Sequence, residues 1–107
     1  MSHQAVSPEE KALFIPLMGV YYDAFEMGIK TNELREYGHR FNERTCRLGR
    51  RVLLSRGYGK ARRMEGTIVS FRKIPARQLR QADQISFEVI YGTLDADAAD
   101  IGIELDP

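Results

Sequence analysis

The feature that most limits the fold of this chain is a set of short segments in which apolar and polar residues alternate, separated by turns that contain glycine or proline. Residues 65–73, 85–91 and 101–105 all show this alternation. A period of two places neighbouring side chains on opposite faces of a β-strand, so each segment predicts a strand with one buried face. Short strands joined by tight turns favour a small β-barrel over a doubly wound sheet.

The other segments predict a first strand, one helix and several connections. Residues 12–17 are apolar and suit a strand that ends near Pro16, because proline removes a backbone donor from the ladder. Residues 20–27 place Tyr21 and Phe25 on one face of a helix. We also expect strands at 31–35 and 51–55, a loop over 36–49, a turn at 57–60, a short basic helix over 76–81 and an acidic loop over 92–100.

The length of 107 residues allows one domain with a modest core. We expect residues 1–11 to form a flexible arm and residues 12–107 to form this domain. The longest apolar run, residues 12–20, is shorter than the roughly 20 residues of a membrane-spanning helix, and no signal-peptide pattern opens the chain. The single cysteine, Cys46, agrees with a reducing compartment. We therefore expect a soluble, cytoplasmic protein that does not contact a membrane.

Charge is strongly segregated along the chain, although the net charge is only +1. Residues 49–80 carry ten Lys or Arg and one acid, Glu65, whereas residues 81–107 carry seven acids and no Lys or Arg. This asymmetry can create a positive surface that meets phosphates. It can equally be neutralised internally, if an acidic strand lies beside a basic one and cross-strand ion pairs form. Both alternatives remain open at this point.

A charge-rich segment joins the end of the predicted helix to the next strand. Gly28 suits a helix C-terminal cap, because the residue after the last turn usually adopts positive φ, which glycine tolerates best. On an extended backbone, Thr31, Glu33 and Arg35 then share one face. Lys30 lies in the turn before them, and its long side chain can reach the same face. The sequence therefore predicts that an amine, a carboxylate and a guanidinium converge.

The pattern Gly-x-Lys-x-x-Glu-x-Arg at residues 28–35, directly after the helix-forming segment 21–27, resembles the signature of ASCH domains, the activating-signal-cointegrator homology family. Residues 51–60 are similar to the strand and turn of phage-type members, and the resemblance covers roughly residues 13–105. It implies an α+β, mainly β fold: a small PUA-like β-barrel of five to six strands. One short helix would pack at the barrel mouth, and the chain would contain a second short helix.

The resemblance also implies that the domain binds RNA or a nucleotide-derived ligand in a polar cleft between helix and barrel. In that cleft Arg35 could bind a phosphate, and Glu33 could accept a proton. Lys30 could act as a base or neutralise an oxyanion. An enzyme with Lys30, Glu33 and Arg35 as catalytic residues is an alternative, either a ribonuclease or an amidohydrolase of acylated nucleosides. The amidohydrolase branch has threonine where this chain has Glu33, which weakens that analogy. A further alternative is a phage-type module that contacts a host protein.

A second group of candidates surrounds the turn at residues 57–60. Tyr58 stands at its tip among basic residues, a composition that can stack a base while holding phosphates, although an ordinary basic turn has the same composition. Adjacent helical residues point about 100° apart, so we expect Tyr21 to pack in the core and Tyr22 to border the cleft. The candidate ligand or nucleic-acid contacts are Tyr22, Lys30, Thr31, Glu33, Arg35, Ser55, Arg56, Tyr58, Lys60, Arg62 and Arg63.

Metal and cofactor chemistry have little support in the sequence. His3, His39 and Cys46 match no metal-binding or thiol-nucleophile motif. No phosphate-binding loop or dinucleotide fingerprint occurs either. We therefore expect neither a metal site nor a cofactor.

Overall fold

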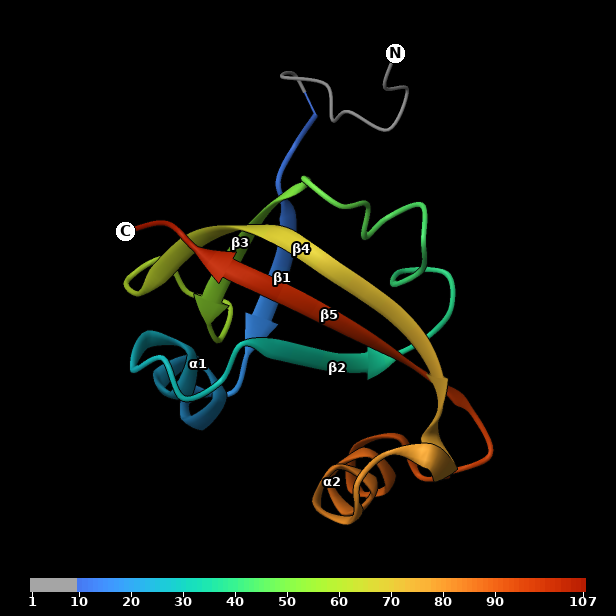
Figure 1. Cartoon of the computed structure of the whole chain (residues 1–107). Coiled ribbons are helices and arrows are strands. Elements are labelled where there is room, and N and C mark those ends of the chain that lie inside the picture. The colour runs from blue at the N-terminus through green and yellow to red at the C-terminus, as the bar shows by residue number, and fades with distance from the viewer. Residues whose placement is uncertain (1–9) are drawn as a thin grey trace.

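The computed structural model describes residues 10–107 and shows an α+β protein that is mainly β. The predicted arm, residues 1–11, lies outside the described residues except for Glu10 and Lys11. Five strands form one sheet in the order β1-β3-β4-β5-β2, and the sheet curls into a half-barrel (Figure 1). The strands are β1 (Leu13–Leu17), β2 (Asn32–Glu36), β3 (Arg51–Arg56), β4 (Arg63–Pro75) and β5 (Asp97–Leu105).

The strand pairing makes β1 and β2 the two edges of the sheet. β1 runs parallel to β3, and the other neighbouring strands are antiparallel. The long strand β4 contacts β3 with its first half and β5 along most of its length. The sequence predicted a mainly β fold with a small barrel of five to six strands; the structure confirms the mainly β α+β class and shows a five-stranded sheet that curls into a half-barrel.

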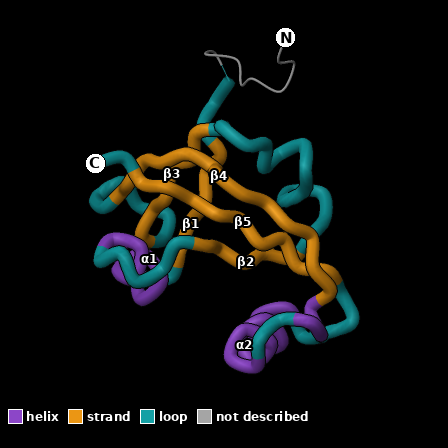
Figure 2. Tube along the Cα trace, viewed as in Figure 1, coloured by secondary structure: helices purple, strands orange, loops and turns teal. Residues whose placement is uncertain are grey.

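Two short helices lie below the sheet in the view of Figure 2, α1 near the start of β2 and α2 near the opposite end of β2. Helix α1 (Gly19–Glu26) ends as predicted, because Gly28 has a φ of +77° and its N–H donates to the carbonyl oxygen of Phe25. Two further amides, those of Ile29 and Lys30, donate to the carbonyl oxygen of Ala24. Within residues 10–107, no helix is both long enough and apolar enough to cross a membrane.

The strand predicted over residues 85–91 is wrong, because this segment belongs to helix α2 (Gln81–Tyr91). Apolar residues at every second position also recur at a spacing of four, so the pattern fits both a strand and a helix. Phe87 and Tyr91 use the helical spacing: their ring centroids lie 4.6 Å apart, and both pack in a cluster beneath α2. The other two positions, Ile85 and Val89, remain exposed.

The neighbouring predictions change with this correction. The short basic helix expected over 76–81 is only a 3₁₀ turn, Ala76–Gln78, and α2 begins at Gln81. The acidic loop expected over 92–100 is shorter, because β5 already begins at Asp97. Ala98 and Ala99 are fully buried there, opposite the end of β4, so strand pairing continues into the acidic segment.

The core consists of two clusters of buried residues. The larger one lies between the sheet and α1, and the loop over 37–50 contributes Phe41 and Cys46 to it. The smaller one joins α2 to the far ends of β4 and β5 through Leu79, Phe87 and Ala98. Helix α2 is therefore anchored separately from α1, and a space remains between the two helices.

Burial of Cys46 gives a direct test of this core. The residue is only 1% exposed, and burial raises the pKa of its thiol above the ordinary value. Because the thiolate is the reactive form, we expect a disulfide reagent at pH 8 to label the native protein at least about 100-fold more slowly than the urea-unfolded chain. Absorbance of the released thiol measures both rates, and equal rates would contradict the packing of this loop.

Candidate functional site

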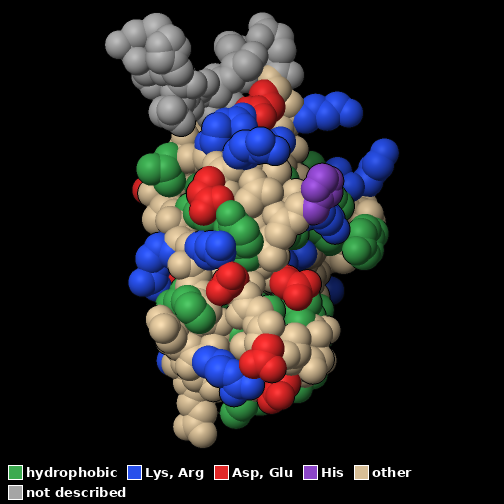
Figure 3. Space-filling view, turned by 90° about the vertical axis from the view of Figure 1, so that its right-hand side faces the viewer, with side chains coloured by type: hydrophobic (Ala, Val, Ile, Leu, Met, Phe, Trp, Pro, Cys, Tyr) green, Lys and Arg blue, Asp and Glu red, His purple; other side chains and the backbone are tan. Residues whose placement is uncertain are grey.

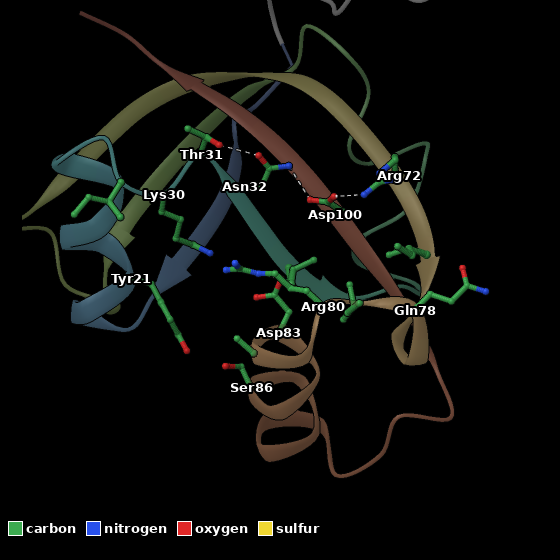
Figure 4. Close-up of a pocket in the computed structure, with 15 residues that line it drawn as sticks. Tyr21, Lys30, Thr31, Asn32, Arg72, Gln78, Arg80, Asp83, Ser86 and Asp100 are labelled. Atoms are coloured by element: carbon green, nitrogen blue, oxygen red, sulfur yellow. Dashed lines mark hydrogen bonds and ion pairs between the residues drawn. The ribbon is translucent and has the colours of Figure 1, made fainter.

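A cleft of about 680 Å³ opens between α1, the first residues of β2 and α2 (Figure 4). This volume lies in the range of about 300–1,000 Å³ that is typical of ligand pockets. Its apolar lining includes Ile29, Leu34, Ile74 and Leu79, and its polar lining includes Tyr21, Lys30, Thr31, Arg72, Arg80, Asp83 and Ser86. A smaller cavity of about 80 Å³ shares Tyr21 and Lys30 with it and reaches Glu33.

Lys30 lies in the wall of the cleft, where the turn after α1 enters β2. Its Nζ is 3.4 Å from Oε1 of Glu33 and 5.3 Å from the ring centroid of Tyr21. Figure 4 shows the amine directed into the space between the two helices. The ammonium group is thus held between a carboxylate and an aromatic ring, and it remains accessible to a ligand in the cleft.

Glu33 and Arg35 form a buried ion pair behind this wall. Glu33 is only 6% exposed, and its Oε2 accepts a hydrogen bond of 2.7 Å from Nε of Arg35. The guanidinium also donates to the carbonyl oxygen of Pro16 and lies 5.3 Å from the ring centroid of Phe41. The predicted convergence of the three charged groups is confirmed by these distances. However, Arg35 points toward β1 and is not among the residues that line the cleft.

The predicted roles of the two adjacent tyrosines are reversed. Tyr22 is 1% exposed and belongs to the main core with Phe25, whereas Tyr21 lines the cleft. The reason is the orientation of α1, whose buried face is set by Tyr22 and Phe25 at a spacing of three. Sequence periodicity alone favoured Tyr21 and Phe25 at a spacing of four, which is equally compatible with one helix face.

A chain of hydrogen bonds crosses the far wall of the cleft from β2 to β4 (Figure 4). Thr31 donates to the amide oxygen of Asn32, and the amide nitrogen of Asn32 donates to Asp100 at 2.8 Å. The other oxygen of Asp100 accepts a bond of 3.2 Å from Arg72. This wall therefore offers hydroxyl, amide and guanidinium groups in fixed positions.

The start of α2 and its N-cap supply cleft residues that the sequence interpretation did not place there, because it ended a short helix at residue 81 and began a strand at residue 85. Arg80 and Asp83 form an exposed ion pair of 2.9 Å at the start of the helix, and Ser86 lies one turn further on. The signals for a helix were present: an acid in the first turn and Gly92 directly after Tyr91, with a φ of +81° in the structure.

Two of the four basic residues at or next to the β3–β4 hairpin, residues 57–62, hold the hairpin against α1. Arg56 pairs with Asp23 at 3.1 Å, and Arg62 pairs with Glu26 at 2.7 Å. The hydrogen bond from Arg56 lowers the pKa of Asp23 and raises the pKa of Arg56. Ser55 is fully buried and donates to the carbonyl oxygen of Gly59. None of these predicted contact residues lines the cleft.

The acidic C-terminal segment neutralises much of the basic segment, so the internal-pairing alternative is confirmed. Cross-strand or nearby pairs join Arg51 to Asp106, Arg72 to Asp100, Lys73 to Asp97, Arg77 to Asp95 and Arg80 to Asp83. Figure 3 accordingly shows basic and acidic side chains interspersed on the face seen there. The positive surface expected from the sequence is therefore reduced to a few groups.

Arg35 and Arg72 provide a matched pair of variants for the buried charge cluster. Arg35→Ala leaves the buried Glu33 with Lys30 alone, and we expect it to lower the free energy of unfolding by about 3 kcal/mol. Arg72→Ala removes a side chain that is 68% exposed from Asp100, which keeps its bond from Asn32, and we expect a loss below about 1 kcal/mol. Urea unfolding followed by circular dichroism measures both, and equal losses would contradict a buried structural pair.

Comparisons with known proteins add no assignment to this geometry. No model of a known protein family matches the chain. No curated protein matches it at a significant level.

Proposed function

We propose that this chain is an ASCH-like domain that binds RNA or a nucleotide-derived ligand in the cleft between α1 and α2. The observation that carries this proposal is the position of Lys30, whose ammonium group faces the cleft beside the ring of Tyr21. A nucleotide combines an anionic phosphate with a flat, partly apolar base. An ammonium group beside an aromatic side chain, within a cleft of this volume, matches both parts of such a ligand.

The residues at the start of α2, across the cleft from Lys30, support the same ligand class. Arg80 is highly exposed, and its ion pair with Asp83 lies at the surface, where such pairs contribute little to stability. Its guanidinium can therefore turn to a phosphate at small cost. The apolar residues Ile29, Leu34 and Leu79 supply contacts for a base or a ribose.

Binding is favoured over hydrolysis by the state of the carboxylates. Glu33 uses one oxygen for Lys30 and the other for Arg35. Asp100 accepts bonds from Asn32 and Arg72. A general base needs a carboxylate that is free to accept a proton from a water or a hydroxyl group. We therefore propose a binding domain rather than a ribonuclease or an amidohydrolase.

We also propose that the curled sheet corresponds to a PUA-like barrel. Support comes from Arg35 of β2, whose guanidinium reaches the carbonyl oxygen of Pro16 in β1. This bond connects the two edge strands at the position where a closed barrel has a hydrogen-bonded ladder. The Arg35 side chain would then take the place of the backbone hydrogen bonds that join the first and last strands of a closed barrel.

The proposal predicts a specific effect of Lys30→Gln. We expect the dissociation constant for nucleoside monophosphates or single-stranded RNA to rise about tenfold, because a charge-assisted bond is lost. The slope of log K against log salt for single-stranded RNA should fall by about 0.7. Titration calorimetry for the nucleotides and fluorescence anisotropy for labelled RNA measure these changes.

Lys73→Gln is the matched control, because this lysine pairs with Asp97 and does not line the cleft. It should leave nucleotide affinity unchanged. Equal affinity of wild type and Lys30→Gln, or no binding by wild type, would overturn the assignment of the cleft. If wild type shortens the RNA in the same mixtures and Lys30→Gln does not, the protein is a ribonuclease and not only a binding domain.

A further inference from the structure

Within the basic segment, residues 50–80, the ion pairs that the structure describes leave two cations without an acidic partner. Eight of the ten basic residues within 50–80 form ion pairs in the described chain. Among residues 10–107, Lys60 and Arg63 have no such pair, and both belong to the same β3–β4 hairpin or its edge. The acid nearest to them in sequence, Glu65, is engaged by Arg51 at 3.4 Å. Lys60 and Arg63 therefore have no acidic partner among the described residues, although both belong to this hairpin or its edge.

An exposed aromatic side chain, Tyr58, lies two residues before Lys60 on the same hairpin. Tyr58 is 81% exposed, which is the highest value among the large apolar and aromatic side chains that the structure describes. Its ring centroid is 6.4 Å from that of Phe14 in β1, and the guanidinium of Arg63 lies 5.4 Å from the Phe14 ring centroid. Phe14, Tyr58 and Arg63 therefore form one surface cluster, with Lys60 on the same hairpin.

The hairpin that carries this cluster is well fixed. The carbonyl oxygen of Gly59 accepts bonds from both Ser55, at 3.0 Å, and Arg63, at 3.3 Å. The N–H of Gly57 donates to the carbonyl oxygen of Leu17 at 2.8 Å, and this ties the hairpin to the end of β1. Because these bonds order the hairpin in advance, binding through Tyr58 needs little further loss of conformational entropy.

We propose that this hairpin cluster, Phe14, Tyr58, Lys60 and Arg63, is a second binding site that takes a single-stranded nucleic acid. A base would stack on the exposed ring of Tyr58, and Lys60 and Arg63 would bind the flanking phosphates. Stacking requires an unpaired base, so the ligand is a single strand and not a duplex. The cluster lies outside the cleft, so this inference stands on different residues from the proposed function.

The composition of the cluster favours nucleic acid over a protein partner. Tyrosine and arginine occur at the centres of both kinds of interface, but lysine is depleted from protein–protein interfaces. An unpaired lysine and an unpaired arginine beside an aromatic ring are the groups that bind a strand through its phosphates and bases. RNA and DNA share this chemistry, so both belong in the test.

The test measures fluorescence anisotropy of labelled ten-nucleotide RNA and DNA single strands and of a matched duplex. We expect Tyr58→Ala to weaken single-strand binding about tenfold and Tyr58→Phe to retain it, because the stacking surface remains. Lys60→Gln together with Arg63→Gln should lower the slope of log K against log salt by about 1.4, since each phosphate contact on a single strand contributes about 0.7. The RNA and DNA arms identify which strand is preferred.

Several results would overturn the inference: unchanged affinity of Tyr58→Ala, equal binding of duplex and single strand, or no single-strand binding by wild type. Because Tyr58 is so exposed, all its variants should keep the circular dichroism spectrum of the wild type. Nucleoside monophosphate affinity separates this site from the cleft. It should fall with Lys30→Gln and stay constant with Tyr58→Ala. If Tyr58→Ala weakens single-strand binding and Lys30→Gln does not, the hairpin is the strand-binding site and the cleft is not. If only Lys30→Gln weakens it, the cleft is the strand-binding site and the inference is overturned.

Discussion

The cleft and the edges of the sheet both depend on the ion pairs that the buried carboxylate of Glu33 forms with Lys30 and Arg35. One oxygen of the carboxylate holds Lys30 at the cleft wall, and the other holds Arg35 in the position from which it reaches Pro16 of β1. A buried carboxylate is costly unless it is paired and hydrogen-bonded, so the two cations are required by the fold itself. Stability and ligand contact therefore share one cluster, and only Lys30 faces the cleft.

Charge pairing decides how the rest of the surface can interact. The acidic strand β5 lies beside the basic strand β4, and α1 presents Asp23 and Glu26 to the hairpin. Each pair contributes little to stability at an exposed surface, but together they remove most of the positive field that the basic segment would otherwise produce. Within the basic segment, Lys60 and Arg63 keep a positive charge that no acid among residues 10–107 pairs with, whereas the neighbouring Arg56 and Arg62 are neutralised by acids of α1. These two cations are therefore the groups of that segment that can bind an external anion without first giving up an ion pair.

Helix α2 shows how an ambiguous pattern hides part of a site. Its apolar residues alternate, so residues 85–91 were predicted as a strand, and the continuous helix that places Arg80, Asp83 and Ser86 along one wall of the cleft was not recognised. Both sides of β5 are already paired, with β2 and β4, so the segment before β5 has no free edge of β5 to join. It folds as a helix that covers the smaller core cluster around Phe87 and Ala98. The same ambiguity of spacing reversed Tyr21 and Tyr22, because periods of three and four both describe one face of a short helix.

The sequence by itself determined the local features: the cap at Gly28, the strands β1 to β4 and residues 101–105 of β5, the turn at the hairpin and the convergence of Lys30, Glu33 and Arg35. These depend on φ preferences, on the alternation of side chains and on separations of a few residues, all of which are encoded locally. Only the tertiary structure decided which cations are neutralised, where Arg35 points and that α2 faces α1 across a cleft. Those outcomes depend on partners far apart in the chain, such as Arg51 with Asp106 and Arg35 with Pro16, and local sequence carries no information on such distances.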